Sequence, residues 1–132
     1  MDTHRRCALC GLSRFIPILV AGLLSACSGE PPQLHAQLDR QHAARGKHLL
    51  AQYQCGSCHV IPGVVASRGT VGPTLRAFGR RSYIAGNVPN QPAALARWIV
   101  DPQSVIPATT MPSMGVSPDD ARAMVAYLYT LQ

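Results

Sequence analysis

The sequence contains few aromatic side chains and little charge. Of its 132 residues, 5% are aromatic and 14% are charged, whereas about a quarter of an ordinary soluble chain is charged. A shortage of aromatics leaves little bulky material for a core, so we expect a non-protein group to fill part of the interior. The hydrophobic share of 47% excludes wholesale disorder, and the length allows one small domain but no two-domain enzyme.

Acidic residues are scarce beside basic ones. Six Asp and Glu stand against twelve Lys and Arg, for a formal charge of +6. This excess favours acidic partners or an anionic surface. The basic residues are not interleaved with aromatics, so we do not expect nucleic acid as a partner.

The apolar segment near the start of the chain is too short to span a membrane. It runs from Phe15 to Leu24, follows three arginines and ends in Leu24-Ser25-Ala26-Cys27, whereas a spanning helix needs about 20 residues. This is the layout of a secretory signal, and its end resembles the bacterial lipobox. We expect residues 1–26 to be a lipoprotein signal peptide, with lipidation at Cys27 anchoring the protein to the periplasmic face of a bacterial membrane. An incidental cysteine behind an ordinary cleavage site is the alternative.

Residues 27–38, with Pro31-Pro32, predict a flexible tether, and residues 39–132 predict one globular domain. Helix signals cover residues 39–53, where Asp39 is a candidate N-cap, and residues 92–100, with Asn90 as candidate N-cap and Asp101-Pro102 as the stop. A third helix follows Ser117 as N-cap and Pro118 at the first helical position. Residues 75–78 predict a short helical stretch, and no strand signal has comparable strength. The fold class is therefore all-α, with loops that need a ligand to pack against.

The chemistry-bearing motif is Cys55-Gly56-Ser57-Cys58-His59, the pattern of covalent haem attachment. Two thiols one turn apart can each add to a haem vinyl group, and the next imidazole can reach the iron. A Cys55–Cys58 disulfide would leave His59 unexplained, and a zinc site would need a second ligand pair. A thioredoxin-like site would need a βαβ pattern. We therefore expect one covalently bound haem c, with His59 as an axial ligand.

Methionines are the candidates for the opposite axial position. Met111 lies in a proline-stiffened loop, Met114 is the second choice, and Met124 falls on the apolar stripe of the last helix, where methionine is usually core. The remaining histidines of the domain are expected to be solvated. We predict Met111 as the sixth ligand, because Met/His coordination suits electron transfer.

The chain resembles class I c-type cytochromes, in particular short bacterial domains related to the one fused to cytochrome c oxidase subunit II. The resemblance covers residues 44–132. It rests on the motif Cys55 to His59 and on the following short stretches: Arg45-Gly46-Lys47, Gly72-Pro73-Thr74-Leu75, Arg81 to Gly86, Trp98-Ile99, Asp101-Pro102, Met111-Pro112 and Ala126-Tyr127-Leu128.

The resemblance implies a fold of about three core helices with loops around one haem. It implies that Gly46 lets the first helix cross the last near Tyr127 and Leu128, and that the Pro73 carbonyl accepts a hydrogen bond from His59. Arg81, Tyr83 and Trp98 would donate to the haem propionates. The chain has one lysine, Lys47, so it lacks the lysine ring of mitochondrial cytochromes c.

The resulting expectation is an electron-transfer protein and not an enzyme. It would carry single electrons between a respiratory or periplasmic donor and an acceptor such as a terminal oxidase, so its partners would be redox proteins and the membrane, with no small-molecule substrate. Two alternatives stay open: an accessory subunit of a larger oxidase or dehydrogenase, and a haem peroxidase or gas-binding protein with an open iron.

Overall fold

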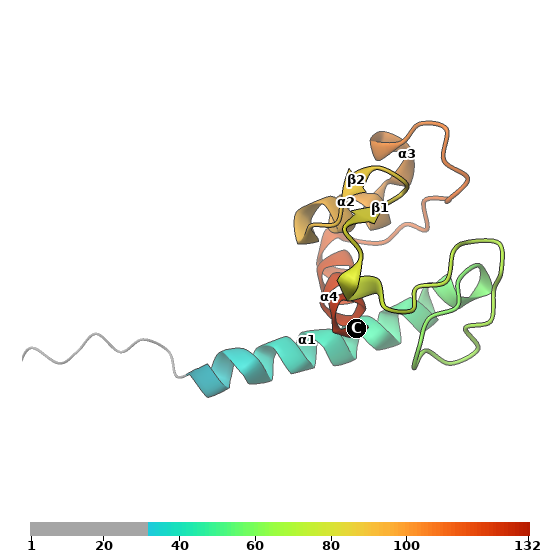
Figure 1. The fold of residues 1–132 in the computed structure, drawn as a ribbon. Coiled ribbons are helices and arrows are strands. Elements are labelled where there is room, and N and C mark those ends of the chain that lie inside the picture. Colours follow the sequence, from blue (N-terminus) through green and yellow to red (C-terminus); the bar gives the residue numbers. More distant parts are fainter. Residues whose placement is uncertain (1–31) are drawn as a thin grey trace, which may run out of the picture. The chain divides into compact units, whose positions relative to one another are not determined.

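The computed structural model describes residues 32–132 (Figure 1), which form one compact unit. The expected signal peptide, Cys27 and the first part of the expected tether lie outside these residues. The elements, in order, are α1 (Pro32–Gln52), a 3₁₀ turn η1 (Cys55–Ser57), a 3₁₀ turn η2 (Phe78–Arg80), β1 (Tyr83–Ile84), β2 (Val88–Pro89), α2 (Pro92–Val100), α3 (Pro102–Val105) and α4 (Pro118–Thr130).

Helix α1 begins earlier than the sequence predicted. Residues 32–38, expected in the flexible tether, are helical, and Asp39 lies inside the helix and does not cap it. The reason is local: Pro32 fits the first turn of a helix, and the five residues that follow it, Gln, Leu, His, Ala and Gln, give the helix no break. The helix ends where Gln54 adopts a left-handed conformation, with φ of 54°.

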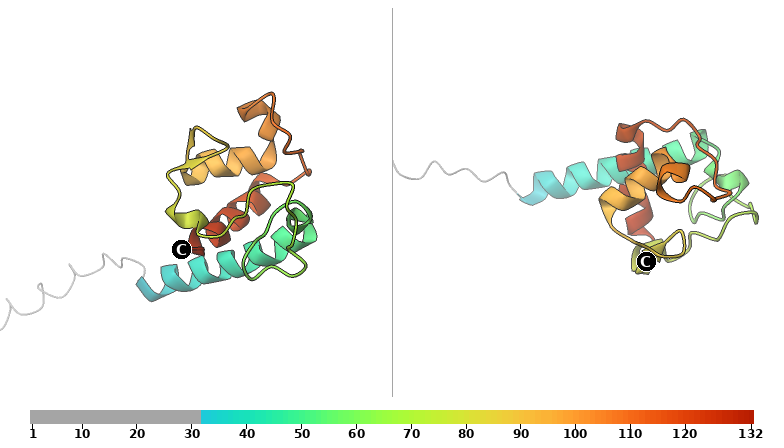
Figure 2. Two further views of the ribbon diagram at one scale, coloured as in Figure 1. Left: turned by 45° about the vertical axis from the view of Figure 1, so that its right-hand side comes forward. Right: turned by 90° about the horizontal axis from the view of Figure 1, so that it is seen from above.

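Helices α1 and α4 cross in close contact, as Figures 1 and 2 show. Gly46 makes this possible, because a Cβ there would overlap the carbonyl group of Ala123 and lie 2.9 Å from the Met124 nitrogen. The two helices therefore cross at Ala123. This is one turn before Tyr127 and Leu128, the residues near which the resemblance implies the crossing. Residues 123 and 127 share one face of α4, and the Tyr127 hydroxyl donates instead to the Pro62 carbonyl at 2.7 Å.

Helix α4 starts as predicted. The Ser117 side chain accepts a hydrogen bond from the Asp120 nitrogen at 3.1 Å, and Pro118 occupies the first turn. Asp120 in turn joins α4 to α1, because it pairs with Arg45 and accepts from the Tyr53 hydroxyl at 2.9 Å. This cluster braces the crossing just before the Cys55 turn.

Helix α2 has the predicted bounds but not the predicted cap. Gln91, not Asn90, is the N-cap, and no side chain caps the helix. The Asn90 amide instead bonds outside the helix, to the Phe78 and Arg81 carbonyls and the Tyr129 hydroxyl. In this position the Asn90 amide has three protein partners. The free N–H groups at the start of α2 can bond to water instead.

The region between α1 and α2 is mostly loop. The helical stretch predicted for residues 75–78 is displaced to the 3₁₀ turn at Phe78–Arg80. The strands β1 and β2 form a two-residue antiparallel ladder, with Tyr83 opposite Pro89. The all-α prediction is confirmed, because helices supply nearly all of the regular structure of residues 32–132.

The core lies between α1, α2, α4 and the loops at the end of α1. Each fully buried Leu or Ile contributes about 1.5–3 kcal/mol relative to exposure. No buried charged or polar side chain occurs among residues 32–132. No helix in this part of the chain is long and apolar enough to cross a membrane. The buried hydrophobic residues are Leu49, Leu50, Ile61, Val64, Phe78, Ile84, Leu95, Ile99, Val116, Ala121, Ala123, Met124, Val125 and Leu128.

Candidate functional site

The two cysteines and the histidine of the sequence motif are brought together by a single turn. After Gln54, the chain forms η1, and the His59 nitrogen donates to the Cys55 carbonyl at 3.0 Å. Both thiols, Cys55 and Cys58, are free and half-buried. The disulfide considered from the sequence is therefore not formed in this structure.

The loop after this turn packs back against it and makes what we call the imidazole wall (residues 55–75). The Gly72 nitrogen donates to the Cys58 carbonyl at 2.8 Å, and the Leu75 nitrogen to the Val60 carbonyl at 2.8 Å. A Cβ on Gly72 would lie 2.6 Å from Nδ1 of His59 and 2.9 Å from Nε2. Any residue larger than glycine would therefore have to displace the imidazole ring or its own backbone.

The Pro73 carbonyl selects the tautomer and the orientation of the His59 ring. Nδ1 of His59 lies 2.7 Å from this oxygen. A carbonyl can only accept, so Nδ1 carries the hydrogen and donates. In a neutral imidazole this leaves Nε2 with its lone pair, which is the form that binds a metal, and the carbonyl contact orients the ring.

A cavity of about 600 Å³ opens beside this turn. Besides the motif residues, its walls come from α2, α4, the hairpin of β1 and β2, and the loop before α4. All eight cofactor-binding residues predicted from the sequence line it. They are Cys55, Cys58, His59, Pro73, Arg81, Tyr83, Trp98 and Met111.

The loop before α4 also lines the cavity, and we call this segment the methionine wall (residues 106–116). Met111 is half-buried, Met114 is 43% exposed, and both line the cavity. Met124 lines it too, from α4, and is fully buried, which agrees with its predicted place in the core. His42 and His48 are exposed on α1, as expected for solvated histidines, and neither lines the cavity.

Burial sets the electrostatics of one thiol. Loss of solvent raises the pKa of Cys55, opposed by a backbone hydrogen bond and reinforced by the nearby Cys58. Near neutral pH the Cys55 side chain is thus a thiol, behaving as a small apolar group with a weak S–H donor.

Arg81 is a cation at the rim of the cavity. Its guanidinium bonds to the Thr74 and Arg76 carbonyls and lies 5.3 Å from the centre of the Phe78 ring. Five N–H donors leave it capacity for an anionic group. Tyr83 is 59% exposed at the same cavity, and Trp98 is half-buried and packs on the core.

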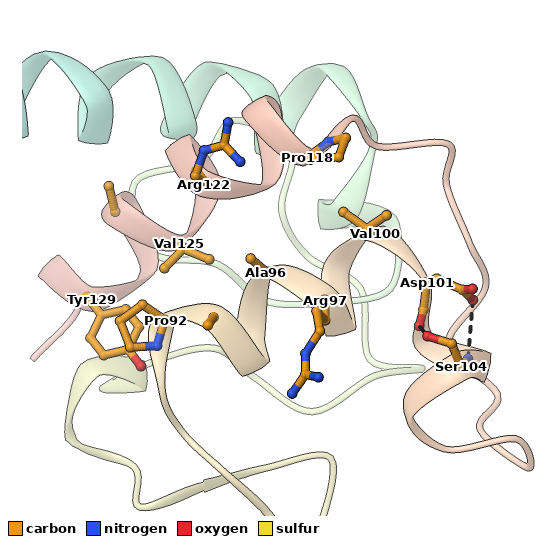
Figure 3. Close-up of a pocket in the computed structure, with 12 residues that line it drawn as sticks. Pro92, Ala96, Arg97, Val100, Asp101, Ser104, Pro118, Arg122, Val125 and Tyr129 are labelled. Carbon is orange, nitrogen blue, oxygen red and sulfur yellow. Dashed lines mark hydrogen bonds between the residues drawn. The ribbon is translucent and has the colours of Figure 1, made fainter.

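A second cavity, of about 860 Å³, lies on the other faces of α2 and α4 (Figure 3). Its lining includes Ala96, Val100 and Val125, with Arg97 and Arg122 at the edges, and contains no Cys, His or Met. It therefore lacks the thiol, imidazole and thioether groups that the sequence predicts as haem-binding, and the cavity beside His59 is the functional candidate.

Sequence reasoning missed two positioning side chains. Asn90 ties the Phe78–Arg81 turn to α4, and so fixes the backbone of Arg81. Gln103 reaches from α3 to the Met111 carbonyl. The sequence indicates Asn90 only as a helix cap and gives no periodic or motif signal for Gln103, so only the structure shows these contacts.

Comparison with known proteins decides the family. The family model for cytochrome c matches residues 43–132. The chain belongs to the cytochrome c family. Among its relatives, cytochrome c oxidase subunit 2 of Alkalihalophilus pseudofirmus is 36% identical over 91 residues, covering 68% of this chain and 26% of the relative. Cytochrome c2 iso-2 of Magnetospirillum molischianum is 31% identical over 91 residues, covering 59% of this chain and 91% of the relative.

The chain therefore spans about a quarter of the oxidase subunit, but nearly all of the cytochrome c2 is matched. No solved structure matches the chain. The cytochrome c family implies haem c, and the residues present fit this group. Two thiols, an imidazole with its Nε2 lone pair available and a thioether line one largely apolar cavity, and Gly72 leaves room for the imidazole ring.

Proposed function

We propose that the protein is a monohaem c-type cytochrome that carries single electrons at the periplasmic face of a bacterial membrane. One observation supports this above all: a single cavity gathers the two thiols, His59 and Met111. When bound, haem supplies an iron that alternates between the ferrous and ferric states, and so carries one electron.

Different side chains would hold the haem by different bonds. Cys55 and Cys58 would form the thioether links, and His59 and Met111 would be the axial ligands. The Pro73 carbonyl keeps the proton on Nδ1 of His59, so that Nε2 stays a ligand. With one nitrogen ligand from His59 and one sulfur ligand from Met111, the iron would have no free position for water or a substrate, which suits electron transfer and not catalysis.

Arg81, Tyr83 and Trp98 are proposed as the propionate donors. All three line the cavity, and their donors would compensate the negative charge of two carboxylates. Apolar walls such as Leu95, Ile99 and Leu128 keep the rest of the site dry, which limits the solvent reorganisation that accompanies each electron.

The test is to express the protein with a cytochrome c maturation system and denature it. Its haem absorbance should stay with the protein through acid-acetone extraction, and native protein should titrate as one reversible one-electron couple. Haem that moves into the solvent would refute covalent attachment. Ferrous protein that binds carbon monoxide at once and fully would instead favour an open iron.

We propose a redox protein as the partner, and a terminal oxidase as one acceptor. A relative named cytochrome c oxidase subunit 2 contains a similar segment within a longer chain, which supports a domain of this type working beside an oxidase. Reduced protein should then drive oxygen uptake by detergent-solubilised native membranes, and addition of the same protein without haem should not. Absence of oxygen uptake would remove the oxidase as acceptor and leave a dehydrogenase-linked role.

Lipidation at Cys27 is the proposed means of attachment to the membrane. The motivation is the sequence Leu24-Ser25-Ala26-Cys27 behind a short apolar segment. Mass spectrometry of the mature N-terminus should find an acylated Cys27 as the first residue. An unmodified Cys27, or residues 1–26 still attached, would refute it.

A further inference from the structure

The part of the chain that carries Met111 has no regular structure of its own. Residues 110–116 lie in neither a helix nor a strand. Within the described residues, each of their hydrogen bonds involves a side chain. The position of Met111 therefore depends on a few individual side chains and not on a backbone ladder.

Both backbone groups of Met111 have such a partner. Its nitrogen donates to Oγ1 of Thr109 at 3.2 Å, a contact within the same loop. Its carbonyl accepts from Nε2 of Gln103 at 3.0 Å, a contact from a different element, α3. Gln103 is thus the side chain that connects the Met111 backbone to the helical part of the fold.

Helix α3 is a firm base for this contact. Pro102 is fully buried, and the Ile106 nitrogen donates to its carbonyl at 2.9 Å. Asp101 caps the helix: its Oδ1 accepts from the Ser104 nitrogen at 3.3 Å, and its carbonyl accepts from Oγ of Ser104 at 2.8 Å (Figure 3). Gln103 lies between Pro102 and Ser104, so the backbone from which its side chain extends is held in place.

We propose that Gln103 is a positioning residue for Met111, and that it sets how readily external ligands displace the methionine sulfur from the haem iron. The inference rests on the proposed function, in which Met111 is an axial ligand. Displacement requires the loop to move, and movement breaks the Gln103 contact. The contact therefore favours the ligated position by the net strength of one neutral hydrogen bond.

The experiment is an imidazole titration of the ferric holoprotein, followed through loss of the far-red charge-transfer band of sulfur-ligated haem. Gln103→Ala should lower the apparent dissociation constant of imidazole about fivefold, which corresponds to about 1 kcal/mol. Gln103→Glu has the same length but no donor and should give a similar or larger drop. Gln103→Lys keeps a donor of similar reach and should stay near the wild-type value.

Gln91→Ala is the matched control, because Gln91 is an exposed glutamine whose side chain caps nothing. It should leave imidazole affinity unchanged. The proposal would be overturned if the apparent dissociation constant of imidazole for Gln103→Ala stayed within twofold of the wild-type value. It would also be overturned if Gln103→Glu and Gln103→Lys changed this constant equally. If the alanine variant does not fold, the comparison of Gln103→Glu with Gln103→Lys carries the test.

This result is separable from failure of the proposed function. If wild-type protein lacks the far-red band, Met111 is not the ligand and the proposed coordination fails. If the band is present but insensitive to Gln103, only the positioning role fails. Thermal melting distinguishes a general loss of stability, since a purely structural effect would lower the melting temperature without changing imidazole affinity.

Discussion

The two walls of the cavity are built on different principles. The imidazole wall is joined by backbone hydrogen bonds between segments distant in the loop, for example from Gly72 to Cys58 and from Leu75 to Val60. The methionine wall between residues 110 and 116 depends on side chains, including Ser113, whose Oγ donates to the Val100 carbonyl at 3.1 Å. Backbone contacts survive most substitutions, whereas side-chain contacts are lost one at a time, so the methionine wall should be the adjustable half of the site.

We expect the largest effect from removing the sulfur of the methionine wall. Met111→Ala should abolish the far-red band and lower the reduction potential, by on the order of a tenth of a volt within the roughly 0.8 V range that axial ligands span. Met114→Ala is the matched variant, three residues away in the same wall, and should change neither. Potentiometry with optical detection measures both. If Met114→Ala gives the larger loss, the sulfurs have been assigned in the wrong order.

Much of the imidazole wall could be predicted because its functional residues are close together in the sequence. The spacing of Cys55, Cys58 and His59 is a property of five consecutive residues, and one turn brings them together. The same holds for the Ser117 cap of α4. Such features depend on near neighbours in the chain, which sequence reasoning can see.

Other features depend on partners far away in the chain. Asn90 has the right residue type for a cap, yet its amide bonds to Arg81 and Tyr129. The sequence predicts the start of α1 seven residues too late, because Pro31-Pro32 suggests an extended segment although Pro32 suits a first helical turn. The contact from Gln103 to Met111 likewise needs the path of α3, which no spacing in the sequence specifies.

Gly72→Ala should disturb the imidazole wall next most strongly. The added Cβ would lie 2.6 Å from Nδ1 of His59, so either the ring or the backbone must move, at a cost of about 1–3 kcal/mol. Denaturant unfolding of the holoprotein measures this cost, and the low-spin spectrum reports the ring. Gly115→Ala is the control, since Gly115 does not line the cavity, its Cβ would meet nothing within 4 Å and only its φ of +69° is unfavourable. A normal axial-ligand spectrum in Gly72→Ala would show that the ring does not need this space.

Tyr53→Phe tests the brace beneath the imidazole wall. The hydrogen bond to Asp120 raises the pKa of the Tyr53 hydroxyl above its usual value near 10, with a smaller contribution from desolvation. The folded protein then keeps this proton where the unfolded chain loses it, so the contribution is complete below about pH 10 and is lost as pH rises further.

Wild-type stability should therefore fall relative to Tyr53→Phe between pH 9 and pH 11. Urea unfolding at both pH values measures the difference, and subtraction removes the effects of Tyr127 and Tyr129, whose pKa values are raised by burial in both proteins. Asp120→Asn should also remove most of this pH-dependent difference in stability between wild type and Tyr53→Phe. A constant gap between wild type and Tyr53→Phe across this range would show that the bond to Asp120 does not control the titration.

We expect the smallest effect from substitutions that change backbone strain in the two walls. Ala66, exposed in the imidazole wall, has φ of 57°, whereas the methionine wall places a glycine, Gly115, at φ of +69°. A left-handed conformation costs an L-residue about 1–2 kcal/mol, while glycine adds about 0.5–1 kcal/mol of unfolded-state entropy. Ala66→Gly should then stabilise the protein by up to about 1 kcal/mol, and Gly115→Ala should destabilise it by a similar amount, because its Cβ meets nothing within 4 Å and conformation alone decides. Urea midpoints with unchanged slopes measure both. A destabilising Ala66→Gly would mean that the imidazole wall needs the stiffness of alanine, and that its backbone hydrogen bonds alone do not hold the loop in place.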